Sequence, residues 1–462
     1  MNKNMENPFS KEFYDSIKNE LFNDILPYWE KNARDTRIGC EGFFGSIENS
    51  GKQNPLTSRS IVMTSRFLWT YSAAARFTKN KAYLEMADFA YKTIVTKFWD
   101  KNHGGVFWQV HPDGAPHVSK KQIYGEAFCC YGLSEYAAAL KELREGEDSP
   151  CGHTSLCPTL SSGGSDDTPA TPLSEECMNL ALDIFNLLEN NARDYKAGGY
   201  IEACATDWSP TTDMILSPKD MNCPKSMNTN LHVMEAYTNL YRTLPVVFPD
   251  LDSVLQETGN ALYELVKVTV EKILQKNAHL AMFFDMEWNS LSDEISYGHD
   301  IEASWLLWEA ACELHNEELK SEIRNTVIRV ADVALSEGFD HKNGCMENFL
   351  FPAGKHEVSE ETKKTSSPFR DRTRVWWNQA EAMNGFYNAW EMTGERKFSD
   401  ACLKQWNWIL NFQIDKTGGE WWNSVDINGK PVLTEDKGGN WKTSYHNGRT
   451  CLELLRRSNM FN

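Results

Sequence analysis

Residues 296–308 read SYGHDIEASWLLW and contain three side chains that could take part in chemistry. His299, Glu302 and Trp305 follow one another at every third position, and in a helix of about 3.6 residues per turn this spacing puts them along one face. The apolar residues of the segment fall on other sides, so this face is neither an ordinary core face nor a plainly solvated one. Such a face has two simple explanations. Either the histidine is a core residue whose hydrogen bond is accepted by a nearby carboxylate, or the three side chains belong to a functional site. Only the rest of the chain separates the two interpretations.

Five other segments open a helical pattern in the same way, with a polar or charged side chain in the first turn. These side chains are Arg66 in SRFLWTYSAA, Glu126 in IYGEAFCCYG, His232 in NTNLHVMEAY, Gln379 and Glu381 in WWNQAEAMNG, and His446 in YHNGRTCLEL. The openings recur roughly every 60 to 80 residues, except where residues 146–176 lengthen one interval. That segment is rich in Ser, Thr, Pro, Gly and Asp, which predicts a surface insert too polar to order itself.

Each interval leaves room for a second helix, as in residues 261–276 and 319–338. Six such units predict an all-α fold, an (α/α)6 barrel of six inner and six outer helices, with short β-hairpin loops at one end. We treat residues 1–462 as a single domain, because no clean linker separates equal halves. If the inner helices run in the same direction, their N-terminal turns meet at one end of the barrel. The polar side chains in those turns then form one site.

The composition of the chain excludes several classes of partner. It has 65 acidic and 47 basic residues, a formal net charge of -18, which disfavours nucleic acid and anionic membrane surfaces. No segment has the ~20 consecutive apolar residues of a membrane span, and the first residues show no signal-peptide pattern, so we expect a cytoplasmic protein. The 12 cysteines form no C-x-x-C pair, and we expect reduced thiols and no metal site.

The residue types in the first turns limit the chemistry. No Gly-rich phosphate loop, H-E-x-x-H motif or nucleophile elbow is present in the sequence. Two classes of reaction remain: glycoside hydrolysis, which needs paired carboxylates, and proton transfer next to a sugar carbonyl, which needs bases that act near neutral pH. Three histidines favour the second class. Tryptophans near these turns suit the apolar face of a sugar ring, and they are Trp305, Trp376, Trp377, Trp421, Trp422 and Trp441.

Four segments together resemble a known family. NTNLHVMEAYTNLYR, SYGHDIEASWLL, WWNQAEAMNGF and WKTSYHNGRTCLE, in this order, closely resemble the motifs of cellobiose 2-epimerases, within the N-acylglucosamine 2-epimerase superfamily. The resemblance runs from about Arg66 to the C-terminus and implies an (α/α)6 barrel. It also implies an enzyme that converts the reducing-end glucose of β-1,4-linked disaccharides to mannose without a cofactor. We expect a disaccharide as the partner, and a monomer or weak homo-oligomer.

The resemblance also assigns roles to residues. It implies that His299 and His446 are the acid/base pair, with Glu302 one turn beyond His299 to fix its imidazole. The other residues that the resemblance assigns to the site are His232, Arg66 and Glu381 for chemistry and Trp305, Trp377 and Trp441, with Trp376 beside them, for sugar binding. The chain departs from the family pattern in the insert at residues 146–176, and in Ser444, where the family usually has proline.

The implied mechanism passes through an enediolate. Once the sugar ring is open, one histidine removes the C2 proton and the other returns a proton to the opposite face, while Arg66 or His232 stabilises the oxyanion. Two alternatives share this chemistry, an N-acylglucosamine 2-epimerase and a mannose-type aldose–ketose isomerase. An inverting glycosidase that uses Glu302 and Glu381 is a third, and a sugar-binding protein without catalysis is a fourth.

Overall fold

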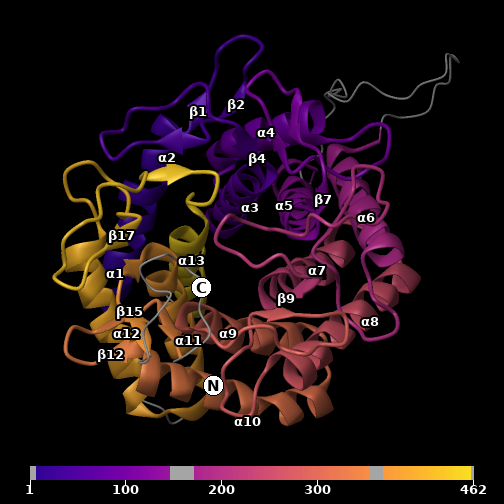
Figure 1. The fold of residues 1–462 in the computed structure, drawn as a ribbon. Helices are drawn as coiled ribbons and strands as arrows, with labels where there is room; N and C mark the ends of the chain where they lie inside the picture. The colour runs from indigo at the N-terminus through magenta and orange to yellow at the C-terminus, as the bar shows by residue number, and fades with distance from the viewer. Residues whose placement is uncertain (1–6, 146–170, 353–367, 459–462) are drawn as a thin grey trace, which may run out of the picture.

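The computed structural model describes residues 7–145, 171–352 and 368–458, whose helices form two concentric rings (Figure 1). The inner ring consists of α3 (Ile61–Thr78), α5 (Ile123–Leu140), α7 (Met227–Val247), α9 (Tyr297–Glu313), α11 (Trp376–Thr393) and α13 (Tyr445–Arg457). The outer ring consists of α4 (Leu84–Thr93), α6 (Leu173–Asn191), α8 (Asp252–Val268), α10 (Glu317–Val333), α12 (Arg396–Trp408) and the N-terminal pair α1 (Lys11–Glu20) and α2 (Leu26–Asn32). The expected (α/α)6 barrel is confirmed.

Burial separates the two rings. Every residue of α5 is buried, whereas α10 buries only Leu319, Ile323, Val327, Val330 and Ala331. A helix that is buried on all sides belongs in the middle of a protein, and a helix with one apolar stripe covers a surface. The sequence of each helix therefore determines its ring.

Short helical turns extend several of these helices. Five-residue π-helical turns follow α1, α4, α5, α8, α10 and α12, at Leu21–Ile25, Ile94–Phe98, Lys141–Glu145, Thr269–Ile273, Ala334–Gly338 and Ile409–Gln413. A 3₁₀ turn at Lys81–Tyr83 precedes α4. The turns after α4, α8, α10 and α12 lie where these outer helices give way to the loops that lead back to the inner ring.

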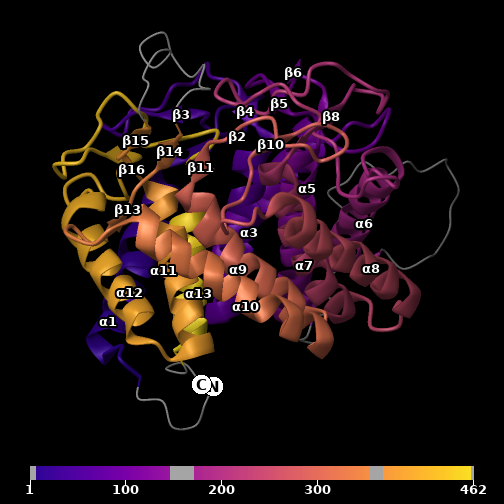
Figure 2. The same cartoon turned by 60° about the horizontal axis from the view of Figure 1, so that its bottom comes forward.

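Eighteen short strands in the described chain lie mainly over one end of the barrel (Figure 2). They are β1 (Arg34–Asp35), β2 (Gly42–Phe43), β3 (Ser46–Ile47), β4 (Arg59–Ser60), β5 (Gln109–Val110), β6 (Pro116–Val118), β7 (Lys121–Gln122), β8 (Ala203–Cys204), β9 (Lys225–Ser226), β10 (Phe283–Phe284), β11 (Ile295–Ser296), β12 (Phe339–Asp340), β13 (Cys345–Met346), β14 (Phe349–Phe351), β15 (Phe369–Asp371), β16 (Arg374–Val375), β17 (Ser424–Val425) and β18 (Gly438–Gly439). The strand before each inner helix pairs antiparallel with a strand that follows the next outer helix, as β9 does with β10. All inner helices therefore begin at the end that carries the strands.

The sixth unit of the ring is built from both ends of the chain. β18, just before α13, pairs with β3 near the N-terminus, through Gly438 opposite Ile47. The indole of Trp421 donates a hydrogen bond of 2.8 Å to Glu20 at the end of α1. The N-terminal helices thus act as the outer helix of α13 and close the ring. The repeat pattern in the sequence did not predict this closure.

The segment expected to be an insert is partly corrected. Residues 146–170, with Cys151 and Cys157, lie outside the described residues, but residues 173–176 begin helix α6. Ser174 is buried there and donates a 2.7 Å hydrogen bond to Glu145, so the expected boundary at residue 176 is wrong. The ten cysteines in the described ranges are free thiols. No helix in these ranges is both long and apolar enough to cross a membrane.

Candidate active site

The N-terminal halves of the inner helices bring most of the expected site residues together. His446 on α13 lies with its Nδ1 2.6 Å from Glu381 Oε1 on α11, and the indole of Trp305 on α9 donates a 3.0 Å hydrogen bond to the other oxygen of Glu381. Burial, with nearby positive charge from Arg66, lowers the pKa of His446 well below its usual value. A neutral imidazole whose Nδ1–H is held by a carboxylate presents Nε2 as a base.

His299 is held by a different partner from the one expected. Its Nδ1 lies 2.7 Å from the hydroxyl of Ser296, the N-cap of α9, and not against Glu302. The expectation that Glu302 orients His299 is therefore wrong, because the carboxylate of Glu302 turns toward Arg449 at 2.9 Å. Burial lowers the pKa of His299 to about 3 and raises that of Glu302 to about 8. His299 is thus also neutral at neutral pH.

His232 on α7 lies beside the other two histidines. Its Nδ1 is 2.7 Å from Glu235 Oε2, and its ring centroid is 5.0 Å from that of Tyr124 on α5. Burial, followed by the charges of Arg66 and Arg449, lowers the pKa of His232 well below its usual value. All three expected histidines therefore have a fixed Nδ1 partner.

Arg449 is a site residue that the sequence analysis missed. Its guanidinium donates to Glu235, to Glu302 at 2.9 Å and to Glu381 at 2.6 Å, and only 1% of the residue is exposed. The arginine lies three residues after His446, which is the same helical spacing that relates His299 to Glu302. That spacing was the signal that could have identified it.

Arg66 on α3 places a second positive charge at the site. It donates a 2.6 Å hydrogen bond to the carbonyl of Trp441 and a 3.0 Å bond to the hydroxyl of Tyr124, and its guanidinium lies 4.5 Å from the centroid of the Phe128 ring. These contacts fix the guanidinium at the N-terminal end of the inner ring. Tyr124, which the sequence analysis did not single out, is held at the same place.

The expected tryptophans differ in exposure. Trp377 and Trp441 are partly exposed, whereas Trp305 and Trp376 are buried. The Trp377 ring lies 4.6 Å from the ring of His299 and 5.8 Å from that of His446, measured between centroids. In this arrangement Trp377 can face a ligand that the two histidines also reach. The buried Trp305 instead holds Glu381 through its indole hydrogen bond.

Gly298 makes room for this arrangement. A Cβ atom at this position would lie 2.7 Å from the Trp377 ring and 2.6 Å from the side chain of Asn378. Real Cβ atoms do not approach this closely, so the glycine lets Trp377 lie against the first turn of α9. The glycine of the SYGHDIE segment thus has a packing role next to His299.

Two of the side chains in the expected series lie outside this group. Glu126 accepts a hydrogen bond of 2.9 Å from the backbone N–H of Val106, and Gln379 accepts one of 3.0 Å from Met346. Both side chains tie an inner helix to a neighbouring loop. Their polar position in the first turn therefore reflects structure and not chemistry.

The carboxylates also have the spacing of a possible metal site. Ligand atoms of Glu302, Glu381 and His446 lie within 4.8 Å of one another. The guanidinium of Arg449 is bonded to both carboxylates and supplies positive charge at this place. The two carboxylates that could bind a metal ion are therefore already paired with the guanidinium of Arg449.

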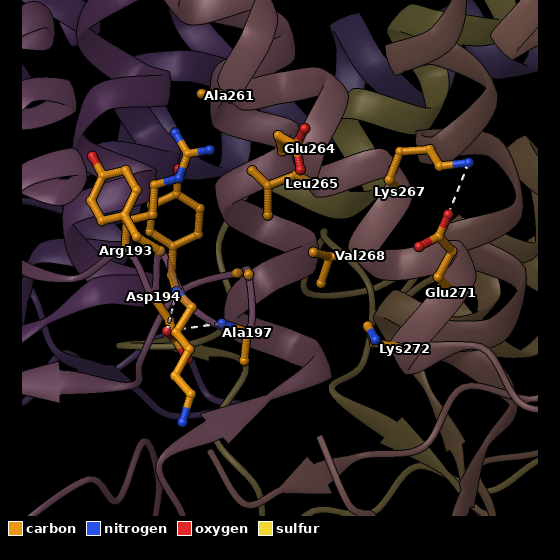
Figure 3. A pocket seen from close by; sticks show the side chains of 15 residues that line it. Arg193, Asp194, Ala197, Ala261, Glu264, Leu265, Lys267, Val268, Glu271 and Lys272 are labelled. Atoms are coloured by element: carbon orange, nitrogen blue, oxygen red, sulfur yellow. Dashed lines mark hydrogen bonds and ion pairs between the residues drawn. The ribbon is translucent and has the colours of Figure 1, made fainter. Parts of the chain in front are cut away.

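A separate cavity of about 270 Å³ lies on the outer side of the barrel, between the loop of residues 193–200 and helix α8 (Figure 3). Lys267 and Glu271 form an ion pair of 2.9 Å at its wall. None of the three site histidines lines it. Charges of both signs alternate around the cavity, and it has no role in the chemistry described above.

Comparison with known proteins agrees with this geometry. The family model of N-acylglucosamine 2-epimerase (GlcNAc 2-epimerase) matches residues 42–149 and 168–449. The chain belongs to this family. The match omits residues 150–167, which lie inside the expected insert, and it ends at Arg449. The expected enzyme class, a carbohydrate epimerase, is confirmed at the level of the family.

Individual relatives are more specific. This chain is 36% identical to a cellobiose 2-epimerase of Bacteroides fragilis, and the match covers 95% of this chain and 97% of the relative. It is 32% identical to a cellobiose 2-epimerase of Dictyoglomus turgidum, over 96% of this chain and 98% of the relative. The structure of a cellobiose 2-epimerase from Bacillus thermoamylovorans superimposes with a TM-score of 0.79 at 31% identity, covering 97% of this chain and all of the other. The resemblance seen in the sequence motifs is confirmed.

Proposed function

We propose that the protein inverts C2 of the reducing-end glucose of β-1,4-linked disaccharides, converting cellobiose to glucosyl-mannose and lactose to epilactose. The observation that carries the proposal is the placement of His299 and His446, two buried and neutral imidazoles that both contact the partly exposed Trp377. Within the described chain, Nε2 of neither histidine has a hydrogen-bond partner. The two Nε2 atoms are therefore available to a substrate that lies against Trp377.

The mechanism moves one proton off C2 and returns one. After ring opening, one histidine takes the C2 proton as the electrons form the C1–C2 double bond of an enediolate, with the negative charge on O1. The second histidine, which became an imidazolium by taking the O1 proton during ring opening while O5 gained a proton from solvent, gives its proton to the opposite face of C2 as the C1 carbonyl re-forms. The first histidine then releases its proton to solvent. Arg66 lies at the same end of the barrel and would stabilise the oxyanion, a contribution of about 3 kcal/mol in comparable sites.

The geometry argues against an inverting glycosidase. Such an enzyme needs two carboxyl groups roughly 6.5–9.5 Å apart, with a water molecule beside one of them. Ligand oxygens of Glu302 and Glu381 lie within 4.8 Å of each other, and neither residue is exposed. These carboxylates hold Arg449 and His446 in place, and they are not arranged to attack a glycosidic bond.

Incubation with cellobiose or lactose in D2O tests the proposal. We expect the 2-epimer as product, with deuterium at C2 of the reducing-end sugar, because each histidine exchanges its proton with solvent between turnovers. A ketose as the main product would identify an aldose–ketose isomerase, and two monosaccharides would identify a hydrolase. Turnover only of N-acylglucosamine would assign the monosaccharide epimerase activity. Full retention of the original C2 hydrogen would exclude proton transfer.

A further inference from the structure

The buried arginine Arg449 connects two histidines of the site through their carboxylates. Its Nη1 donates to Glu235, which holds Nδ1 of His232 at 2.7 Å. Its Nη2 donates at 2.6 Å to Glu381 Oε1, the same oxygen that lies 2.6 Å from Nδ1 of His446. A continuous path of hydrogen bonds thus runs from one imidazole to the other, across helices α7, α13 and α11.

Charge balance explains why an arginine stands at the centre of this path. Three carboxylates, Glu235, Glu302 and Glu381, converge where they are almost fully removed from solvent. Burial raises the pKa of Glu302 to about 8 and that of Glu381 well above its usual value, and the charge of Arg66 opposes both shifts. The direct contacts of Arg449, at 2.9 Å to Glu302 and 2.6 Å to Glu381, favour the ionised form of both carboxylates. Burial lowers the pKa of Arg449 only to about 10, so the guanidinium keeps its charge at neutral pH.

Aromatic rings fix the plane of the guanidinium. The carbon at its centre lies 4.8 Å from the centroid of the Trp305 ring and 4.5 Å from that of Tyr445, whose hydroxyl accepts a 2.5 Å hydrogen bond from Nη1. The titratable or charged side chains that surround Arg449 and its partners on the inner helices are Arg66, Tyr124, Tyr131, His232, Glu235, His299, Glu302, Glu381, Tyr445, His446 and Glu453. Apart from Arg449 itself, Arg66 is the cation of this set.

We infer that Arg449 is a positioning residue for catalysis: it keeps Glu381 ionised and thereby sets the tautomer of His446, and through Glu235 it ties His446 to His232. This inference rests on the proposed proton-transfer function. An ionised carboxylate can only accept a hydrogen bond, so it selects the imidazole with Nδ1–H and a free Nε2. A protonated Glu381 would instead donate to Nδ1 and place the imidazole hydrogen on Nε2, which removes the base.

The test compares Arg449→Met, Arg449→Lys and Glu235→Gln with Arg242→Met as the matched control. Arg242 also bridges two carboxylates, Glu309 at 2.7 Å and Glu313 at 3.0 Å, but it is only half-buried and lies near the C-terminal ends of the inner helices. Each variant is measured for thermal unfolding, for the pH profiles of kcat and KM, and for ¹⁵N resonances of its histidines. The His446 signals are assigned from their loss in His446→Asn.

We expect Arg449→Met to lose about 10²- to 10⁴-fold in kcat, the loss seen when a catalytic histidine is held in the wrong tautomer, with a smaller change in KM. Its ¹⁵N spectrum should show His446 moving from the Nδ1–H to the Nε2–H form. Arg449→Lys should recover part of the rate, because it keeps the charge but not the forked geometry. Arg242→Met should unfold at a lower temperature than the wild type. Its kcat should stay within about threefold of the wild-type value, and its His446 should keep the wild-type tautomer.

Glu235→Gln supplies evidence even if Arg449→Met does not fold. It leaves Arg449 and Glu381 in place, yet we expect it to shift the His446 resonances and the pH profile of kcat through the arginine. Unchanged His446 resonances in Glu235→Gln, or a folded Arg449→Met with the kcat and tautomer of the control, would overturn the inference. If the wild-type protein exchanges no C2 hydrogen, the proposed function fails, whereas the ¹⁵N measurements still decide the role of Arg449.

Discussion

His446 Nδ1 and Glu381 Oε1 lie 2.6 Å apart and join helix α13 to helix α11 at the N-terminal end of the inner ring. In the proposed mechanism the carboxylate both orients the ring and stabilises the positive charge that His446 acquires when it takes a proton. His299 has only the hydroxyl of Ser296 in the equivalent position, 2.7 Å from its Nδ1. The two proposed bases are therefore supported unequally, His446 by a charged carboxylate and His299 by the dipole of a hydroxyl group.

Replacement of Glu381 by Gln tests this support. We expect kcat to fall by about 10²- to 10⁴-fold, because the amide keeps the shape but not the charge that stabilises the imidazolium. Steady-state kinetics on the disaccharide, with C2 deuterium exchange in D2O, measure the effect. Glu309→Gln is the control, since Glu309 also bonds an arginine but at the opposite end of the inner helices. A Glu381→Gln enzyme with normal kcat would show that His446 does not need the carboxylate.

Much of this site could be predicted from the sequence, because each repeat of the barrel places a polar side chain near the start of its inner helix. The polar side chains near the start of the helical patterns pointed to Arg66, His232, His299, Glu381 and His446, and in the structure these residues lie in the N-terminal halves of the inner helices. The pattern alone could not separate chemistry from structure. Glu126 and Gln379 occupy the same kind of position but bind backbone groups of neighbouring loops.

Other features depend on contacts between distant parts of the chain, and sequence spacing does not record these contacts. Ser296 replaced Glu302 as the partner of His299, because the guanidinium of Arg449, more than 140 residues further on, attracts that carboxylate. The closure of the ring by α1 also depends on a contact between residues far apart in the sequence, the hydrogen bond from the indole of Trp421 to Glu20. Periodicity predicts which face of a helix is buried, but it does not predict which helix lies against that face.

Gly298→Ala tests the close packing beside His299. The added methyl group would overlap the Trp377 ring, 2.7 Å away, and would have to push that ring away from both histidines. We expect kcat/KM to fall by about 10²-fold, since displacements of about 1 Å in a site have effects of this size. Gly259→Ala on α8 is the control, because its Cβ would meet Tyr241 at 2.9 Å, outside the site. Equal kcat/KM values for the two variants would exclude a functional role for this glycine.

Glu20 makes the stability of the ring closure dependent on pH. Burial, assisted by the charge of Asp24, raises the pKa of Glu20 to about 9, against 4.5 as its usual value. The folded protein therefore holds a proton that the unfolded chain releases, and its stability falls as the pH rises from about 4.5 through about 9. The Glu20→Gln side chain cannot titrate, keeps an acceptor for Trp421, and its amide N–H takes the place of the carboxyl proton as a donor toward Asp24.

We expect Glu20→Gln to be more stable than the wild type, with a gain that is at least about 1 kcal/mol larger at pH 8 than at pH 5.5, because one pKa unit corresponds to about 1.4 kcal/mol. Urea unfolding at the two pH values measures the gain. Asp15 is an exposed acid of the same helix, and Asp15→Asn should change the free energy of unfolding equally at the two pH values. A gain from Glu20→Gln that does not grow with pH would show that Glu20 is ionised in the folded protein.

Ser444 stands at the N-cap of α13, two residues before His446. Its φ of -67° matches the value of about -65° that the proline ring imposes, and its hydroxyl is buried without a partner among the described residues. Its backbone N–H also donates no hydrogen bond within those ranges. Proline at this position would therefore keep the observed φ and remove no hydrogen bond of the described residues.

We expect Ser444→Pro to raise the free energy of unfolding by about 0.4–1 kcal/mol, because the ring reduces the conformational entropy of the unfolded chain and the unpaired hydroxyl is removed. Ser444→Ala separates these causes, since it removes the hydroxyl but leaves the backbone free. Urea unfolding of both variants should therefore rank Ser444→Pro above Ser444→Ala, and the difference between them measures the backbone contribution. If Ser444→Pro is the less stable of the two, the first turn of α13 needs a backbone conformation that proline cannot adopt. The placement of His446 would then depend on the serine in this chain.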